Sequence, residues 1–364
     1  MVEYATGSLR TAIMCLTVST IILEYLSLSI SESVSNFFFS EDGKRMAVQK
    51  KTDSGWSLTL FDFEKNSETE LIRSENISKN TTDFITAIMP PDLKKLFIEI
   101  RENKKSKFYL LATDRPGNFT SLAFLGNDFG EIYFNQQNPQ KLFLLKKMEV
   151  REVNLALSSI SSPLLKNVAA LKTRANNVYY LDGDGFLYRT DYSLSPGSKI
   201  NDVPITLDKN VSHQLEVFPA GFILKEADAL YYLDENAKIF KKLTDAVNNF
   251  RISHDAEKLA YWNNSEIWVF FFKDKNDQPT KKMYDKSFVT RFSGKIEDVF
   301  WYTDHYLIFV SGNKIKISEI DDRDSLNIFD LADFQSPKIV WDKYRSLLYV
   351  FTQDNLFLSD KLIK

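Results

Sequence analysis

Short runs in which apolar and polar residues alternate recur from residue 34 to the end of the chain. The clearest is Phe37-Phe38-Phe39-Ser40, which resumes after Glu41-Asp42-Gly43 at Met46-Ala47-Val48. Alternation with a period of two indicates a strand with one buried face. The Asp-Gly pair between the two runs favours a tight turn. The phrase therefore predicts a strand, a turn and a second strand.

The same phrase returns at residues 250–261, and weaker copies open near residues 86, 132, 168, 216, 299 and 339. The mean step between the openings is about 43 residues. Repeats of about 40–45 residues with four strands each are the signature of a β-propeller. We therefore predict an all-β fold, a β-propeller of four-stranded antiparallel blades. Eight blades are preferred and seven are the alternative, because the fourth and fifth units are weakly marked.

The last unit opens at Ile339 and has three strand-like runs without an outer fourth one. A spare strand lies near the other end of the chain at Tyr25 to Ile30, where apolar residues alternate with serines. Pairing these two segments would leave no open sheet edge. We therefore predict that an N-terminal strand closes the ring of blades.

The segment before this strand contains an uncharged and mostly apolar run, residues 11–23, between Arg10 and Glu24. Its length is typical of the apolar region of a signal peptide and is short of the ~20 residues of a spanning helix. The alternative is that residues 21–30 are simply a strand of the domain. We expect residues 1–24 to be a signal or membrane-anchor segment and residues 25–364 to be the propeller domain.

Composition narrows the function classes. The net charge is −3 and lysine and arginine are scattered, so there is no electrostatic footprint for nucleic acid. Cys15 is the single cysteine, which excludes an intramolecular disulfide. His213, His254 and His305 lie far apart in the sequence, so a zinc site is not expected.

Three charged segments are candidates for binding chemistry. Asp182-Gly183-Asp184-Gly185 resembles part of a calcium loop but lacks its further carboxylates, so we favour a hairpin turn. Asp321-Asp322-Arg323-Asp324 offers a cation site or, as we favour, an internal ion pair in which Arg323 holds a turn. The lysine-rich run from Lys273 to Lys286 is interpreted as a solvated loop between strands, with contact to anionic polymers as the alternative.

Four tryptophans, Trp56, Trp268, Trp301 and Trp341, fall on strands at comparable places in their units. We expect most of them to pack between blades, and stacking of an exposed one on a glycan is the alternative. The chain has no nucleophile elbow, phosphate loop or His-Glu-x-x-His motif. We therefore assign no catalytic, cofactor-binding or metal-binding residues, and the binding residues are left open.

Two phrases, residues 39–44 and 252–260, resemble the WD40-like repeat of TolB-type propellers, Phe-Ser-Pro-Asp-Gly-Lys-x-Leu-Ala. Glu41 and His254 stand where that family commonly has proline. The stretch from Lys314 to Leu331 is similar to propellers that follow a PEGA domain in membrane-anchored bacterial surface proteins. No PEGA domain is present, and the resemblance covers roughly residues 34–364.

This resemblance implies an extracytoplasmic protein, membrane-anchored or secreted, with a binding or scaffold role; a cytoplasmic location is the alternative. We expect a non-enzymatic module that binds a protein or glycan partner and no nucleic acid. It would contact a membrane only through the N-terminal segment and need no cofactor. The alternative is an enzyme, a lyase or glycan hydrolase, with its active site at the channel mouth. Such an enzyme would need carboxylates, histidines or a metal converging on the inner strands.

Overall fold

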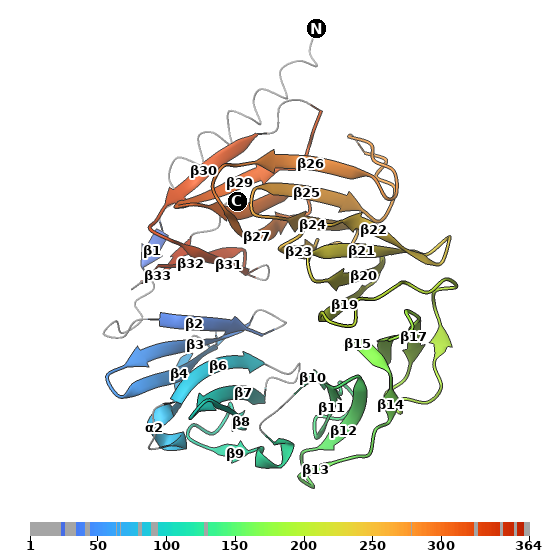
Figure 1. Ribbon diagram of the computed structural model, residues 1–364. Helices are drawn as coiled ribbons and strands as arrows, with labels where there is room; N and C mark the ends of the chain where they lie inside the picture. The colour runs from blue at the N-terminus through green and yellow to red at the C-terminus, as the bar shows by residue number, and fades with distance from the viewer. Residues whose placement is uncertain are drawn as a thin grey trace. The chain divides into compact units, whose positions relative to one another are not determined.

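The computed structural model describes residues 23–25, 34–40, 44–62, 64–65, 67–78, 82–88, 94–126, 130–277, 279–323, 327–342, 345–352 and 355–359. The described chain is almost entirely β and forms eight antiparallel sheets (Figure 1). This confirms the predicted β-propeller of four-stranded blades, with eight rather than seven of them. The blades are numbered here in chain order, and they divide into two compact units that are described separately.

Blades 1 to 5 form the unit of residues 36–247, and within each blade the strands follow chain order. Blades 1 and 2 consist of β2 (Val34–Phe39), β3 (Arg45–Thr52), β4 (Gly55–Asp62), β5 (Ser67–Arg73), β6 (Thr82–Ile88), β7 (Lys95–Glu102), β8 (Lys105–Ala112) and β9 (Phe119–Ser121). Blades 3 to 5 consist of β10 (Glu131–Phe134), β11 (Lys141–Lys146), β12 (Glu149–Asn154), β13 (Ser159–Ile160), β14 (Leu165–Lys166), β15 (Val168–Arg174), β16 (Asn177–Asp182), β17 (Leu187–Thr190), β18 (Ser198–Lys199), β19 (His213–Phe218), β20 (Gly221–Glu226), β21 (Ala229–Asp234) and β22 (Ile239–Thr244). In blade 3 the outer position is shared by β13 and β14, which both pair with β12.

Blades 6 to 8 form the second unit. Their strands are β23 (Asn249–Ile252), β24 (Lys258–Trp262), β25 (Glu266–Phe271), β26 (Lys286–Arg291), β27 (Ile296–Thr303), β28 (Tyr306–Ser311), β29 (Lys314–Glu319), β30 (Ile328–Asp333), β31 (Lys338–Asp342), β32 (Leu347–Phe351), β33 (Leu356–Ser359) and, from the N-terminal part of the chain, β1 (Leu23–Tyr25).

The last blade takes its outer strand from the N-terminal part of the chain, as predicted. Strand β1 pairs antiparallel with β33, with Leu23 opposite Ser359 and Tyr25 opposite Phe357. The paired strand begins two residues before the predicted segment, and residues 26–30 lie outside the described residues. Residues 1–22 also lie outside them, so the signal or anchor hypothesis stays a prediction. No helix among the described residues is long and apolar enough to cross a membrane.

The serine of the repeated phrase has a structural role in both of its clearest copies. The backbone N–H groups of Arg45 and Lys258 donate to the hydroxyls of Ser40 and Ser253, at 3.0 and 2.9 Å. Both serines are buried, so their hydroxyls satisfy donors that would otherwise lack water. The phrase recurs because each copy holds the turn between the first two strands of a blade.

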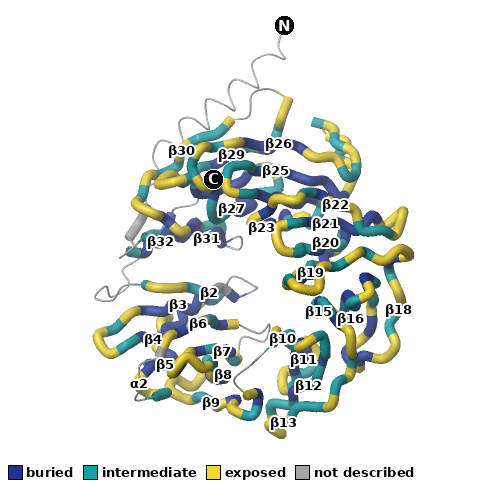
Figure 2. Tube along the Cα trace, in the orientation of Figure 1, coloured by how far each residue is buried: buried dark blue, intermediate teal, exposed yellow. Residues whose placement is uncertain are grey.

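Packing between neighbouring blades explains why some strands are apolar at every position. Strand β11 is buried from Leu142 to Leu145 (Figure 2). Leu142 and Leu144 join a cluster with residues of blade 2, whereas Phe143 and Leu145 join one with residues of blade 4. A strand covered on both faces loses the simple alternation of a half-exposed strand.

The connection between blades 1 and 2 is polar in sequence from Ser74 to Asp83, and it begins with a helical turn. A one-turn helix, α2 (Ser74–Ile77), follows β5, and β6 begins at Thr82. The buried hydroxyl of Ser74 accepts a hydrogen bond of 3.1 Å from the backbone N–H of Trp56. This contact ties the connection to β4, and a linker defined by polarity alone does not reveal it.

Asp234 holds the turn between β21 and β22. Its Oδ1 accepts from the backbone N–H groups of Asn236 and Ala237 at 3.1 and 3.0 Å, and its Oδ2 lies 2.6 Å from Lys241 Nζ. The bond from Lys241 and the two N–H groups hold the pKa of Asp234 below its ordinary value. The carboxylate is nearly buried, with 6% of the residue exposed.

We expect Asp234→Asn to lower the free energy of unfolding by about 1–2 kcal/mol at neutral pH, because a charged acceptor is lost. Because the pKa of Asp234 is lower in the folded chain, its carboxylate stabilises the fold at pH values above the pKa that Asp234 has in the unfolded chain. This stabilisation disappears as the pH falls through the folded-state pKa. Urea unfolding should therefore show a difference between wild type and variant that shrinks as the pH is lowered from 7 towards 3. Asp245→Asn, at an exposed ion pair with Lys242, is the control and should change little. A pH-independent difference would contradict the assignment.

Candidate functional site

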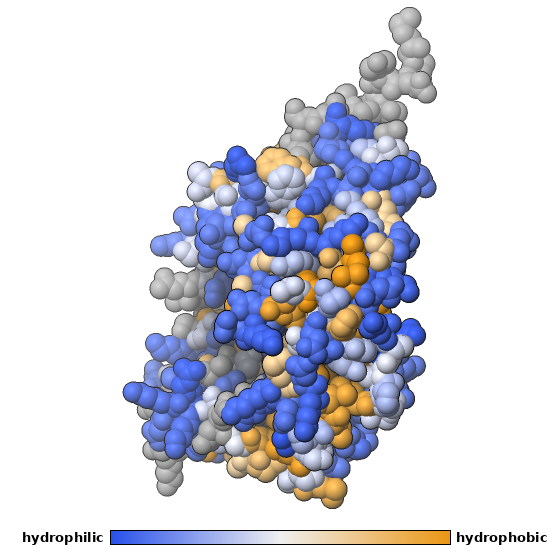
Figure 3. Space-filling model, turned by 45° about the vertical axis from the view of Figure 1, so that its right-hand side comes forward, coloured by the Kyte–Doolittle hydropathy of each residue, from blue (hydrophilic) through white to orange (hydrophobic). Residues whose placement is uncertain are grey.

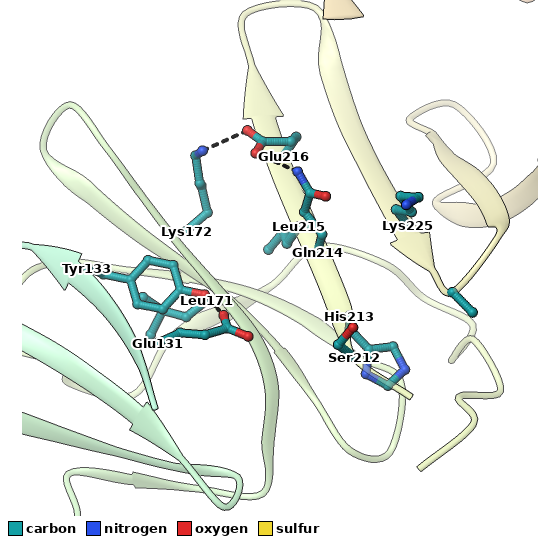
Figure 4. Close-up of a pocket in the computed structure, with 11 residues that line it drawn as sticks. Glu131, Tyr133, Leu171, Lys172, Ser212, His213, Gln214, Leu215, Glu216 and Lys225 are labelled. Atoms are coloured by element: carbon teal, nitrogen blue, oxygen red, sulfur yellow. Dashed lines mark hydrogen bonds and ion pairs between the residues drawn. The ribbon is translucent and has the colours of Figure 1, made fainter. Parts of the chain in front are cut away.

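A pocket of about 270 Å³ opens on the first strands of blades 3, 4 and 5 (Figure 4). Its charged and polar lining includes Glu131 and Tyr133 from β10, Lys172 from β15, and Gln214 and Glu216 from β19. In a propeller the blades surround a central channel, and first strands are the ones that face it. The pocket lies wholly within the unit of residues 36–247.

The local sequence of β19 explains how polar groups reach the pocket. Leu215 and Val217 are buried and pack with residues of blade 4. Gln214 and Glu216 alternate with them and are more exposed. Because successive side chains of a strand point to opposite faces, burial of the two apolar residues turns the two polar residues towards the pocket.

An ion pair bridges two of the blades inside the pocket. Lys172 Nζ lies 2.7 Å from Glu216 Oε2, and the amide nitrogen of Gln214 donates to Glu216 Oε1 at 3.3 Å (Figure 4). The two charged side chains are 34% and 23% exposed, so solvent screens them in part. Glu216 is thus neutralised by a cation of the neighbouring blade.

Tyr133 forms the aromatic wall of the pocket, and its hydroxyl donates to Oε2 of Glu131. Burial and the negative charge of Glu131, with a smaller contribution from Glu216, raise the pKa of Tyr133 well above its ordinary value. The hydroxyl therefore stays protonated at neutral pH. It remains a donor that fixes the position of the Glu131 carboxylate.

His213 stands at the edge of the pocket, where β19 pairs with β20. Its Nε2 lies 3.0 Å from Oε1 of Glu226, the residue opposite it in the register. The same carboxylate oxygen accepts the backbone N–H of Asp208 at 2.7 Å. Both side chains are nearly buried, at 6% and 11% exposure, so this pair is part of the packing of blade 5.

The two acidic turns are structural, as the sequence analysis favoured. Asp182 Oδ1 accepts the backbone N–H groups of Asp184 and Phe186 at 3.0 and 2.8 Å, in the hairpin between β16 and β17. Arg323 Nε lies 3.0 Å from Asp321 Oδ1, which is the internal ion pair that was predicted. Asp324 lies outside the described residues. No group of three or more His, Cys, Asp or Glu side chains suited to a metal occurs in the described part of the chain.

The lysine-rich run connects β25 to β26, as predicted, but it is not simply solvated. Lys281 is 15% exposed and pairs with Asp322 at 2.6 Å, and Lys275 forms a β-bridge with Lys281. Burial lowers the pKa of Lys275. The connection packs against the acidic turn of blade 7, because the turn supplies carboxylates that offset the buried lysines.

The tryptophans differ from the prediction in placement. Trp56 and Trp268 lie on third strands of their blades, whereas Trp301 and Trp341 lie on first strands, so their places are not comparable. Trp56, Trp301 and Trp341 are buried, as expected of packing between blades. Trp268 is partly exposed and packs edge-on against Phe288, 5.1 Å between ring centres.

Among the residues that the structure describes, surface hydrophobicity indicates no other site. Hydrophilic residues dominate the face shown in Figure 3, with hydrophobic ones appearing between them. Among the described residues, the large hydrophobic side chains exposed by more than a third are Ile88, Leu157, Leu164, Val203 and Phe288. They belong to four different blades, and exposed apolar residues scattered in this way are normal for a folded surface.

Sequence reasoning missed the pocket because none of its residues belongs to a motif. Glu131, Lys172 and Glu216 lie about 40 residues apart, each on a different blade. The available signal was that the first strand of three successive repeats carries a charged residue at a position whose side chain is not buried in the blade. That signal becomes specific only when the repeats are aligned by their strand register.

No family model matches the chain. A segment of 124 residues is 27% identical to the pantothenate synthetase of Thermotoga petrophila and covers 32% of this chain and 42% of that protein. The enzyme of the same name from Thermotoga neapolitana is 29% identical over equal shares. The match thus spans less than half the length of these curated relatives.

Solved structures show similarity over most of the chain. The Dos1 propeller has a TM-score of 0.57 at 11% identity and covers 94% of this chain and 96% of its own. The WD40 domain of SCAP from fission yeast has a TM-score of 0.55 at 10% identity, over 94% and 99%. A prolyl endopeptidase has a TM-score of 0.52 at 12% identity, over 96% of this chain and 60% of its own. These similarities confirm the propeller fold.

Proposed function

We propose that the chain is a non-enzymatic interaction module that binds a protein partner at the pocket of blades 3 to 5. The observation that carries this proposal is the fixed geometry of the pocket. The side chains of Lys172, Glu216 and Tyr133 are held by one another or by neighbours on rigid strands. Polar groups positioned in this way lose little conformational freedom when a partner binds.

The size of the pocket favours a protein over a glycan partner. Its volume of about 270 Å³ is below the range of roughly 300–1,000 Å³ that is usual for small-molecule sites. Such a pocket accommodates one or two side chains of a protein that docks on the surrounding blades. A glycan chain would need an extended groove lined by exposed aromatic rings.

The first strands bring two carboxylates and a histidine together, as an enzyme would need, but Glu216 and His213 are engaged within the protein, which favours binding. A general acid or base must be free to exchange a proton with a substrate. Glu216 is paired with Lys172, and His213 is paired with Glu226, so both are engaged in the protein. A lyase or glycan hydrolase remains the alternative function, and turnover of a polysaccharide by the purified chain would favour it.

A pair of double variants tests the binding site. Lys172→Ala with Glu216→Ala removes the ion pair of the pocket, whereas Lys242→Ala with Asp245→Ala removes an exposed ion pair elsewhere in blade 5. We expect cross-linking in the source cells to capture a partner with wild type and the control pair. Capture with the pocket pair should fall by about tenfold, and purified partner should reproduce the difference. Equal capture by both double variants would refute the pocket as the binding site.

We also propose that the propeller is presented outside the cytoplasmic membrane, by analogy with the surface propellers that its C-terminal stretch resembles. Protease added to intact cells is expected to digest a tag placed after Lys364, while a cytoplasmic marker stays intact. Digestion of the tag only after lysis would contradict this location.

A further inference from the structure

Glu131 differs from the other carboxylate of the pocket. Glu216 pairs with Lys172 across the blades, but Glu131 has no lysine or arginine at ion-pair distance among the described residues. Glu131 is exposed to solvent at the pocket rim and accepts the Tyr133 hydroxyl. The pocket therefore presents a held carboxylate whose charge no cation of the described chain neutralises.

Tyr133 adds a second feature that attracts a cation. Its ring lines the pocket beside Glu131, and an aromatic face attracts ammonium and guanidinium groups. Burial first, and then the negative charge of Glu131, raise the pKa of Tyr133. The carboxylate and the ring both favour a positive charge at the same place.

The opposite side of the pocket carries the opposite charge. Lys225, on β20 next to Gln214 in the register, lines the pocket and has no carboxylate at ion-pair distance among the described residues. Figure 4 shows Lys225 on the far side of β19 from Glu131 and Tyr133. A ligand cation is therefore directed to the Glu131 side, because Lys225 repels it from the other.

We infer that the pocket takes the basic side chain of a protein partner, a lysine or an arginine, with its charged end against the Glu131 carboxylate and its stem along the Tyr133 ring. This inference rests on the proposed function and names the chemistry of the partner. An ammonium or guanidinium group makes charge-assisted hydrogen bonds to a carboxylate. The pocket of about 270 Å³ has room for such a side chain but not for a folded segment.

Small cations test the inference without a known partner. Saturation-transfer NMR on the full chain would compare n-butylammonium and n-butylguanidinium with n-butanol and pentanoate, which have a similar apolar stem. We expect the two cations to bind at least about fivefold better than n-butanol, and pentanoate to bind least. Binding of the cations should weaken as salt is raised towards 1 M, because exposed charges are screened. Equal binding of n-butanol and the cations would overturn the inference.

Variants locate the binding in the pocket. Glu131→Gln keeps the size of the side chain and should weaken cation binding by about tenfold, the effect of losing one charge-assisted hydrogen bond. Glu64→Gln, at an exposed ion pair with Lys44 in the same unit, is the matched control and should bind like wild type. Tyr133→Phe keeps the ring and frees Glu131, so it should give an intermediate loss with an unchanged unfolding temperature. Cation binding that survives in Glu131→Gln would also overturn the inference.

The same variants separate this inference from the function on which it rests. Suppose that partner capture is lost in the Lys172 and Glu216 double variant but retained in Glu131→Gln. The pocket then binds a partner without a basic side chain, and only the inference fails. If all variants capture the partner equally, the proposed binding site fails as well.

Discussion

Replacing Asn201 with alanine is expected to lower the free energy of unfolding by about 3 kcal/mol. The Leu187 N–H and the Val203 carbonyl lose their partner in a buried place, and the Gly185 carbonyl keeps only the N–H of Ile205. The Asn201 side chain is fully buried. Its Oδ1 accepts the backbone N–H of Leu187 at 2.7 Å, and its Nδ2 donates to the carbonyl oxygens of Gly185 and Val203 at 3.0 and 2.8 Å. Asn201 thus joins the hairpin of blade 4 to the irregular connection that follows β18.

The backbone at this place leaves no room for rearrangement. Gly185 has a φ of +90°, and a Cβ added to it would lie 1.9 Å from the carbonyl oxygen of Ile205. The connection is therefore in direct contact with the hairpin turn. We therefore expect the loss in free energy of unfolding to lie near the upper part of the range for buried polar groups that lose a hydrogen-bond partner.

Two further variants sharpen the measurement by urea unfolding. Asn201→Asp keeps the acceptor but sets a carboxylate oxygen against two carbonyl oxygens, so it should destabilise at least as much as alanine. Asn210→Ala removes an exposed amide that donates to Asp208, and it should change stability little. Hydrogen exchange at residues 183–206 should increase in both Asn201 variants. A loss below about 1 kcal/mol for Asn201→Ala would show that the connection adjusts.

Removing residues 1–25 is expected to lower the thermal midpoint by about 5 °C or more, because β33 loses its partner strand and the last blade becomes three-stranded. The exposed edge of β33 would also offer unpaired N–H and C=O groups to other molecules, so we expect aggregation on heating. Differential scanning calorimetry and light scattering measure the two effects.

A shorter truncation is the matched control for this prediction. Removing residues 1–20 leaves β1 at Leu23–Tyr25 intact, so this shorter truncation should melt at a higher temperature than the chain that lacks residues 1–25. Glu24→Pro in the full chain takes away a backbone donor from the strand and should resemble the longer truncation. The importance of β1 would be refuted if the two truncations melted at the same temperature.

The fold was predictable because almost all of its pairing is local. Each blade is a run of consecutive antiparallel strands, so period-two alternation and turn residues define it within one repeat. The repeated Ser40 and Ser253 mark the first turn of a blade for a physical reason, since their hydroxyls bond across it. The pairing of an N-terminal strand with the last blade was predictable for another reason, because the last repeat lacks a fourth strand of its own.

The pocket was not predictable because its chemistry depends on pairings between repeats. Nothing in the sequence near Lys172 indicates that its partner is Glu216, and Glu131 is distinguished by having no such partner within the part of the chain that the structure describes. The role of Asn201 was also not predictable from the sequence, although it acts within one blade. It lies in a connection without strand periodicity, and its role follows from the docking of that connection on Gly185. Motif searches find neither, since both depend on three-dimensional neighbours.

The pairing of β1 with β33 has a consequence for the order in which the molecule forms during synthesis. The strands of the other blades are close in sequence and form local hairpins as soon as they leave the ribosome. Strand β1 is made first, yet its partner follows more than 300 residues later. At the usual rate of about 5–20 residues per second, β1 waits for roughly 15 seconds or longer without a partner. During that interval a chaperone or another nascent chain competes for β1, and its pairing with β33 is the last to form.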